Sequence, residues 1–140
     1  MPYEKDLNSW NEFSKKLETV EPPYFREQEI WWIAFGTNIG VEIDGKHELF
    51  ERPGIIFKKL NREYALVIPI TRTENKIPKI HVPISCAGIK KGSVATISQI
   101  RSMSSKRLLR KAGVLPLNQF AKLLDKFMVM VSTADMQVTD

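Results

Sequence analysis

Several features that would assign this sequence to a particular class of protein are missing. Cys86 is the only cysteine, which excludes an internal disulfide and a cysteine-based zinc site. No apolar run approaches the roughly 18 residues that a membrane-spanning helix needs, and the first residues contain no apolar signal core. These absences predict a cytoplasmic protein that makes no use of a membrane.

The signatures of common catalytic sites are also missing. The sequence has no glycine-rich phosphate loop, no Gly-x-Ser-x-Gly elbow and no helical His-Glu-x-x-His. His47 and His81 are the only histidines, and two isolated histidines are more often incidental than a proton-shuttling pair. Carboxylates are numerous but show no pairing signature, so glycoside hydrolysis has no support.

Acidic side chains are missing from one long segment. Residues 75–124 contain ten lysines and arginines and no acid, whereas residues 1–74 contain ten basic and thirteen acidic residues. Such a one-sided segment raises the local positive potential and attracts a polyanion or an acidic protein segment. It favours nucleic-acid binding, and the alternative is a solvated basic face without a charged partner.

The residues that are present indicate one small domain that begins and ends with a helix. A chain of 140 residues with 43% hydrophobic and 26% charged residues is long enough for one modest core. An amphipathic helix is predicted over residues 4–20, before Pro22-Pro23. Pro116 suits the first turn of a closing helix. The apolar residues at helical spacing are Leu7, Trp10, Phe13 and Leu17 in the first helix and Phe120, Leu123, Leu124, Phe127 and Val131 in the second.

Short runs rich in isoleucine, valine, tryptophan and tyrosine lie between the two helices and predict β-strands. The predicted strands are Glu29–Phe35, Gly54–Leu60, Tyr64–Ile70, Ile77–Ile84, Ser93–Ile100 and a further short one at Lys111–Leu115. Trp31 and Trp32 point to opposite faces of one strand, so one of them is expected in the core. Five or six short strands closed by a helix predict an α+β protein built on a small, strongly bent barrel.

Four blocks of this sequence resemble, in the same order, those of the MazF/PemK toxins. They correspond to the family's first strand and loop, its Arg-Pro signature, the strand with its active-site threonine, and its fourth block. Here the blocks are Glu29–Ile33 with Gly40-Val41-Glu42, Arg52-Pro53, Val67–Thr71, and Ser93-Val94 with Gln99–Ser102 and Lys106–Leu108. The resemblance covers about residues 26–130.

This resemblance implies an SH3-like β-barrel (MazF/PemK/CcdB-like) that works as a homodimer, here with an added N-terminal helix and a C-terminal helix. The expected division is an accessory helix and linker (1–24), the barrel domain (25–131) and a polar tail (132–140). We expect the N-terminal helix to contribute to stability rather than to chemistry. A polar tail of this kind is expected to fray.

The function implied by the resemblance is that of a sequence-selective endoribonuclease for single-stranded RNA. Such toxins need no metal or cofactor and are held in check by a cognate antitoxin. Carried over residue by residue, the catalytic candidates are Arg52, Thr71 and Glu42. The candidate RNA contacts are Gln99, Ser102, Arg101, Arg72 and Thr73.

These roles agree with the chemistry of RNA cleavage without a metal. The 2′-hydroxyl is the nucleophile, so the enzyme must accept its proton, stabilise the phosphorane and protonate the leaving 5′ oxygen. Arg52 offers a planar fork of donors and suits an electrostatic clamp. Thr71 can donate a hydrogen bond to the same phosphate, and Glu42 could act as base if it is desolvated or placed beside the hydroxyl.

The sequence also departs from the family pattern, which leaves three alternatives open. The loop from Glu42 to Arg52 is longer than usual, Arg72-Thr73 follows Thr71, and Gly54 replaces a branched apolar residue. An inactive or retargeted member is therefore one alternative. A gyrase-poisoning toxin of the same fold is the second, although residues 135–140 lack its C-terminal aromatic residue. The third is a barrel that binds RNA passively.

Overall fold

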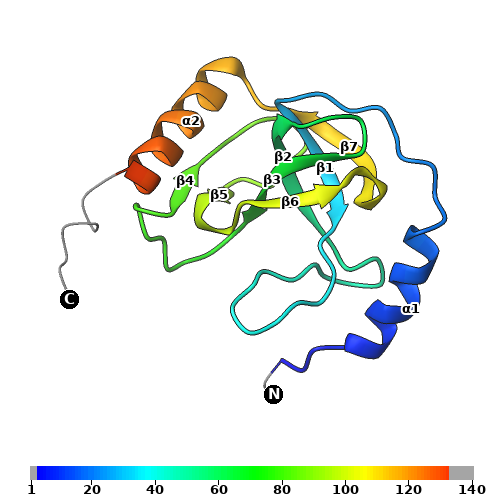
Figure 1. Cartoon of the computed structure of the whole chain (residues 1–140). Helices are drawn as coiled ribbons and strands as arrows, with labels where there is room; N and C mark the ends of the chain where they lie inside the picture. The colour runs from blue at the N-terminus through cyan, green and yellow to red at the C-terminus, as the bar shows by residue number, and fades with distance from the viewer. Residues whose placement is uncertain (1–2, 133–140) are drawn as a thin grey trace.

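Seven antiparallel strands form one strongly bent sheet in the computed structural model, which describes residues 3–132 (Figure 1). The strands are β1 (Glu29–Ala34), β2 (Glu51–Lys59), β3 (Tyr64–Thr71), β4 (His81–Pro83), β5 (Val94–Thr96), β6 (Arg101–Ser104) and β7 (Leu108–Val114). Their order is β4-β5-β3-β2-β1-β7, and β6 also pairs with β3. β3 has two neighbours on one edge, because β6 pairs with residues 64–67 and β5 with residues 70–71.

A helix lies at each end of the described chain. α1 (Leu7–Leu17) begins after Asp6, whose carboxylate caps it by accepting from the Ser9 amide at 2.9 Å. α2 (Leu117–Ser132) follows Pro116, and the 3₁₀ turns η1 (Ile97–Gln99) and η2 (Ser105–Arg107) flank β6. The predicted α+β class with a helix at each end is confirmed. β4 and β7 end the sheet, and barrel closure between them is not found within residues 3–132.

The strands differ from the prediction in the second half of the chain, where the predicted run Ser93–Ile100 is a strand only at β5, because residues 97–99 form the turn η1. Only His81–Pro83 of the run Ile77–Ile84 is a strand, because the amides of Ile80 and His81 both donate to the Ile77 carbonyl and form a turn. β6 was not predicted, since its Arg-Ser-Met-Ser sequence has one apolar residue, the buried Met103. Residues 133–140 of the predicted tail lie outside the described part of the chain.

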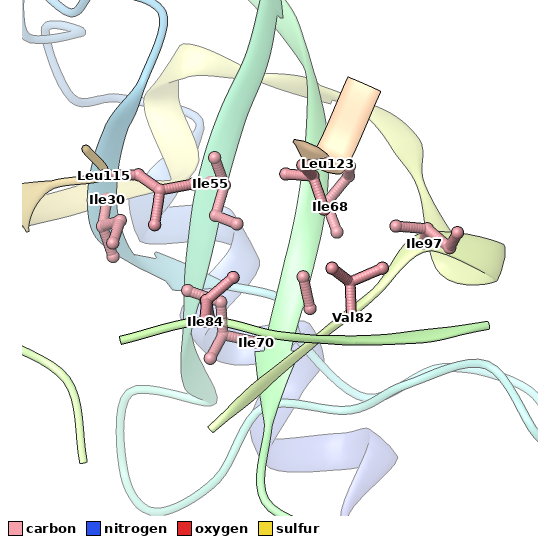
Figure 2. Packing of buried hydrophobic residues seen from close by; sticks show 10 residues of the cluster. Ile30, Ile55, Ile68, Ile70, Val82, Ile84, Ile97, Leu115 and Leu123 are labelled. Carbon is pink, nitrogen blue, oxygen red and sulfur yellow. The ribbon is translucent and has the colours of Figure 1, made fainter. Parts of the chain in front are cut away.

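Two hydrophobic clusters lie on opposite faces of the central strands. Figure 2 shows the first, in which Leu123 of α2 and Leu115 join strand residues that include Ile30, Ile55 and Ile68. The second includes neighbouring residues of the same strands, such as Trp31, Ile56 and Val67, which point the other way. Its members are Phe25, Trp31, Ile33, Phe35, Ile56, Ala65, Val67, Met103 and Leu108. The alternation confirms that Trp31 is a core residue, while Trp32 is half-buried beneath Arg110.

Close packing explains one departure from the family pattern. A Cβ atom at Gly54 would lie 2.8 Å from Ile33 Cδ1 and 2.9 Å from Val67 Cγ1, so a branched residue there would displace these side chains. Gly54, two residues after Arg52, therefore leaves space for the side chains of Ile33 and Val67. Within residues 3–132, no helix combines the length and apolar character needed to cross a membrane.

Candidate active site

Arg52 and Thr71 meet at one end of the β2–β3 pair. The register of the two strands aligns Gly54 with Pro69, so two residues further along Arg52 lies beside Thr71. Arg52 Nη1 donates a hydrogen bond to Thr71 Oγ1 at 2.9 Å. The threonine oxygen is the acceptor in this bond, so its own hydrogen stays available to donate to a ligand. The fold thus brings together two residues that the resemblance assigned to catalysis.

A backbone carbonyl of the β1–β2 loop orients the Arg52 guanidinium. Arg52 Nε donates to the Asp44 carbonyl at 2.8 Å, and no partner of its Nη2 atom is found in residues 3–132. Burial lowers the pKa of Arg52 from its ordinary value, and the carboxylate of Asp44 opposes this shift. The guanidinium is therefore held at two nitrogen atoms, which leaves Nη2 as the atom that can donate to an anion.

Asp44 links this loop to the N-terminal segment. Its Oδ1 accepts from the Asn38 amide at 2.6 Å, while its Oδ2 accepts from the Tyr3 hydroxyl at 3.1 Å and pairs with Lys5 Nζ at 3.3 Å. Sequence reasoning did not identify Asp44, because its partners lie up to 41 residues away in the chain. The Asp44-Gly45 step indicates a turn and nothing more.

A hollow of about 1140 Å³ opens between the N-terminal segment and the β1–β2 loop. Arg52 forms part of its wall, together with Lys5 and Phe13 on one side and His47 and Phe50 on the other. The wall carries both acids and bases, so it does not form a continuous cationic track. Because Arg52 lines this hollow, a ligand can reach it from here.

Glu42 lies apart from the Arg52–Thr71 pair. It is exposed on a turn, and its carboxylate accepts from the Ile39 amide at 3.1 Å. Within the described chain, no hydrogen bond or ion pair joins it to Arg52 or Thr71. Glu42 instead lines a second hollow of about 370 Å³, together with Gln99 and Arg101. A role as base would require the turn that carries Glu42 to approach the Arg52–Thr71 pair when RNA binds, because the attacking 2′-hydroxyl lies next to the phosphate.

The side chain of Gln99 is already engaged by the protein. Its Oε1 accepts from the Ile43 amide at 2.9 Å, and its Nε2 donates to the Val41 carbonyl at 2.8 Å. These two bonds fix the segment that contains Glu42 against η1. A direct RNA contact by Gln99 stays a prediction, and its observed contacts are those of a residue that shapes the loop.

The remaining candidate RNA contacts fall into two groups. Arg101 and Ser102 lie on β6, where Arg101 is half-buried with Nη1 3.5 Å from Asn38 Oδ1 and Ser102 is exposed. Arg72 and Thr73 follow Thr71 directly, with Arg72 exposed and the hydroxyl of Thr73 accepting from the Asn75 amide at 3.1 Å. Arg72 and Thr73 thus adjoin the Arg52–Thr71 pair, whereas Arg101 lines the second hollow with Glu42.

Several cations of the basic segment have partners within the protein. Arg107 Nη1 donates to the Ala34 carbonyl at 3.0 Å, and its guanidinium lies over the Trp10 ring. Burial, with a contribution from nearby Arg101, lowers the pKa of Arg107 to about 10. Lys111 pairs with Glu29 at 3.0 Å. The segment is thus not one uniform RNA-binding face, which its sequence alone did not reveal.

The two histidines do not form a pair within residues 3–132. His47 lines the larger hollow, while His81 on β4 uses Nδ1 to accept from the Ile77 amide at 2.9 Å. In the same residues there is no group of three or more histidine, cysteine or carboxylate side chains that could hold a metal ion. Arg52 and Thr71 therefore remain the catalytic candidates that the structure brings into contact.

Comparison with a protein-family model identifies the family of this chain. The model for PemK-like, MazF-like toxins of type II toxin–antitoxin systems matches residues 26–131. This chain belongs to the PemK/MazF-like toxin family. The match excludes α1 and includes β1 through nearly all of α2. A search of curated proteins gives no significant match.

Solved structures of the family show the same fold at low sequence identity. MazF (Form-I) from Deinococcus radiodurans has a TM-score of 0.61 at 16% identity, covering 81% of this chain and 100% of that one. A mycobacterial endoribonuclease in complex with its cognate antitoxin has a TM-score of 0.57 at 13% identity, covering 79% and 98%. The Mycobacterium tuberculosis toxin MazF-mt6 has a TM-score of 0.53 at 21% identity, covering 60% and 89%.

Proposed function

We propose that this toxin-family member is a metal-independent, sequence-selective endoribonuclease that cleaves single-stranded RNA. The observation that supports this most strongly is the hydrogen bond between Arg52 and Thr71, two residues 19 apart in sequence, of which Arg52 lines the larger hollow. Family membership adds support, since related structures are described as endoribonucleases.

In this proposal, the 2′-oxygen of the RNA attacks the neighbouring phosphorus and the bond from phosphorus to the 5′ oxygen breaks. Arg52 Nη2 and the Thr71 hydroxyl donate to the non-bridging oxygens, where negative charge increases in the transition state. The turn that carries Glu42 moves beside the bound RNA, where its carboxylate accepts the 2′-hydroxyl proton, and the leaving 5′ oxygen takes a proton from solvent. The products are a 2′,3′-cyclic phosphate and a 5′-hydroxyl end.

Cleavage of a short single-stranded RNA in the presence of EDTA tests the proposal. The wild-type protein should cut at preferred sites, and Arg52→Lys should reduce the single-turnover rate by about 10²–10³-fold, because lysine keeps the charge but loses the fork. Arg26→Lys changes an exposed arginine elsewhere and is the matched control. A passive RNA-binding barrel would bind without cutting, and a gyrase poison would act only on the topoisomerase.

We also propose that the protein forms a homodimer and binds a cognate antitoxin. Phe120 and Phe127 pack on Phe57 within the chain, whereas α2 exposes several large apolar residues that a partner copy could cover. These are Leu117, Leu124, Met128, Val129 and Val131. Relatives have been crystallised with an antitoxin, among them MazE–MazF (Form-II) from Deinococcus radiodurans.

The proposed homodimer is tested by sedimentation at micromolar concentration. The expected mass is twice 16.1 kDa, and a monomer under these conditions would contradict the proposal.

A further inference from the structure

We infer that Lys5 is a positioning residue of the candidate active site: it braces the loop that holds Arg52. The catalytic consequence of this inference rests on the proposed ribonuclease function, whereas its geometric part does not. Lys5 lies outside residues 26–131, which match the family model, and it reaches the site from the N-terminal segment.

The ammonium group of Lys5 contacts three oxygens of one short loop. Lys5 Nζ donates to the Asn38 carbonyl at 2.5 Å and the Gly40 carbonyl at 3.1 Å, and it pairs with Asp44 Oδ2 at 3.3 Å. The side chains of Lys5 and Asp44 are only 25% and 12% exposed. An ammonium has three donors, and here all three can be directed to residues 38–44. Such a shielded, multiply bonded pair fixes geometry better than an exposed ion pair does.

The braced loop is connected directly to the candidate catalytic pair. The side-chain carboxylate of Asp44 accepts from the Asn38 amide at 2.6 Å, which closes the loop. The backbone carbonyl of Asp44 accepts from Arg52 Nε at 2.8 Å. Arg52 in turn donates to Thr71 at 2.9 Å. A displacement of the loop therefore moves the acceptor that sets the orientation of the guanidinium. A shift of about 1 Å in a catalytic group can slow a reaction by about 10²-fold.

Aromatic packing holds the N-terminal segment where Lys5 can reach this loop. Figure 1 shows α1 beside the long β1–β2 loop, at the other end of the molecule from α2. The rings of Trp10 and Phe13 have their centroids 5.5 and 6.0 Å from that of Phe50, which precedes β2. A Cβ atom at Gly36 would lie 2.5 Å from Trp10, so only glycine admits the indole there. The β1–β2 loop, which is longer than the family pattern, is thus packed against the N-terminal segment.

The test compares Lys5→Met with Lys5→Arg. Lys5→Met should lower the single-turnover cleavage rate about 10- to 100-fold while the half-saturating RNA concentration changes less than about twofold, since the effect is on orientation. Lys5→Arg should restore much of the rate, because it keeps the cation and its donors. Lys15→Met is the matched control: Lys15 lies on α1, 65% exposed, and pairs only with Glu12 among the described residues.

A second measurement does not depend on ribonuclease activity. Hydrogen exchange at Arg52 Nε, followed by NMR, should be faster in Lys5→Met than in the wild-type and Lys15→Met proteins, because the bond to the Asp44 carbonyl loosens. If the wild-type protein fails to cut RNA but this exchange accelerates, the proposed function is wrong and the positioning role stands. Unchanged exchange overturns the inference, whatever the cleavage rates are.

Tyr3→Phe removes a single bond to Asp44 and is the milder variant to use if Lys5→Met does not fold. It should accelerate the Arg52 Nε exchange to a smaller extent, and no acceleration would equally overturn the inference.

Discussion

α2 and α1 contact the sheet in different ways. α2 inserts the fully buried Leu123 into the first hydrophobic cluster, and its two phenylalanines pack on Phe57. Leu17 is the one buried residue of α1, while its Trp10 and Phe13 pack against the β1–β2 loop. Leu7, expected on the apolar face of α1, is 49% exposed.

We therefore expect α2 to contribute mainly to the stability of the fold and α1 mainly to the geometry of the candidate active site. Burial of apolar surface contributes about 25 cal/mol per Å², so α2 and the cluster beneath it should carry much of the folding free energy. α1 and residues 3–6 cover less apolar surface but contact the loop that orients Arg52. The family model extends into α2 and omits α1, in agreement with α2 as part of the shared core.

The largest stability effect is expected in α2. Leu123→Ala removes a fully buried side chain and leaves a cavity, so it should lower the free energy of unfolding by about 2–5 kcal/mol. Leu124→Ala changes the neighbouring residue, which is 45% exposed, and should cost much less. Urea unfolding followed by circular dichroism measures both. Equal losses would show that Leu123 does not anchor the helix.

A smaller stability effect is expected in α1, accompanied by loss of cleavage. Trp10→Ala removes a half-buried ring, so it should cost roughly 1–3 kcal/mol, less than the 3–5 kcal/mol typical of a buried tryptophan. Its cleavage rate should fall as well, since the ring packs beside the β1–β2 loop. Thermal unfolding and single-turnover cleavage of the same sample give both values. A loss of stability without any change in the cleavage rate would show that α1 has only the stabilising role expected from the sequence.

A pH-dependent effect is expected away from both helices, at Glu29. Burial acts to raise the pKa of Glu29, but hydrogen bonds from Trp31, the Arg26 amide and Lys111 outweigh it and lower the pKa below 4.5. A carboxylate with a lowered folded-state pKa stabilises the protein above the unfolded pKa, and this stabilisation is lost as the pH falls through the folded value. Glu29→Gln should therefore be destabilised at pH 7, by about 1 kcal/mol.

The stability difference between Glu29→Gln and the wild-type protein should shrink below pH 4.5. Chemical denaturation at several pH values measures it, and a difference that stays constant down to pH 3 would contradict the assignment.

The smallest effect concerns the RNA affinity of single cations. Arg101 lines the second hollow, whereas Lys111 pairs with Glu29, so only Arg101→Ala should flatten the salt dependence of single-strand binding. The expected change in the log–log slope is about 0.7 for one phosphate contact. Titrations at several salt concentrations measure it. A flatter slope in Lys111→Ala, with none in Arg101→Ala, would place the RNA on the β7 side.

The sequence predicted the fold where side-chain periodicity is strong and local. The strands with Ile55, Ile68 and Trp31 were predicted from their local enrichment in β-branched and aromatic residues, and the helix with Leu123 from the helical spacing of its apolar residues. β6 escaped because its pairing with β3 depends on tertiary contact and not on its own polar residues. Similarly, the resemblance supplied Arg52 and Thr71, but it could not supply Asp44 or Lys5.

Asp44 and Lys5 contact each other across distant parts of the chain. Lys5 and Asp44 lie 39 positions apart and outside any motif, so no local pattern marks their ion pair. The engagement of Gln99 with residues 41–43 also depends on how the loop folds.

The central claim is that Arg52 and Thr71 act as a unit on one phosphate, and a double-mutant cycle on single-turnover RNA cleavage tests it most directly. Arg52→Lys and Thr71→Ala should each slow cleavage by about 10²–10³-fold. If the two residues act together, the double variant should be little slower than either single variant. Near-wild-type rates in both single variants, or fully multiplicative losses in the double variant, would contradict the claim.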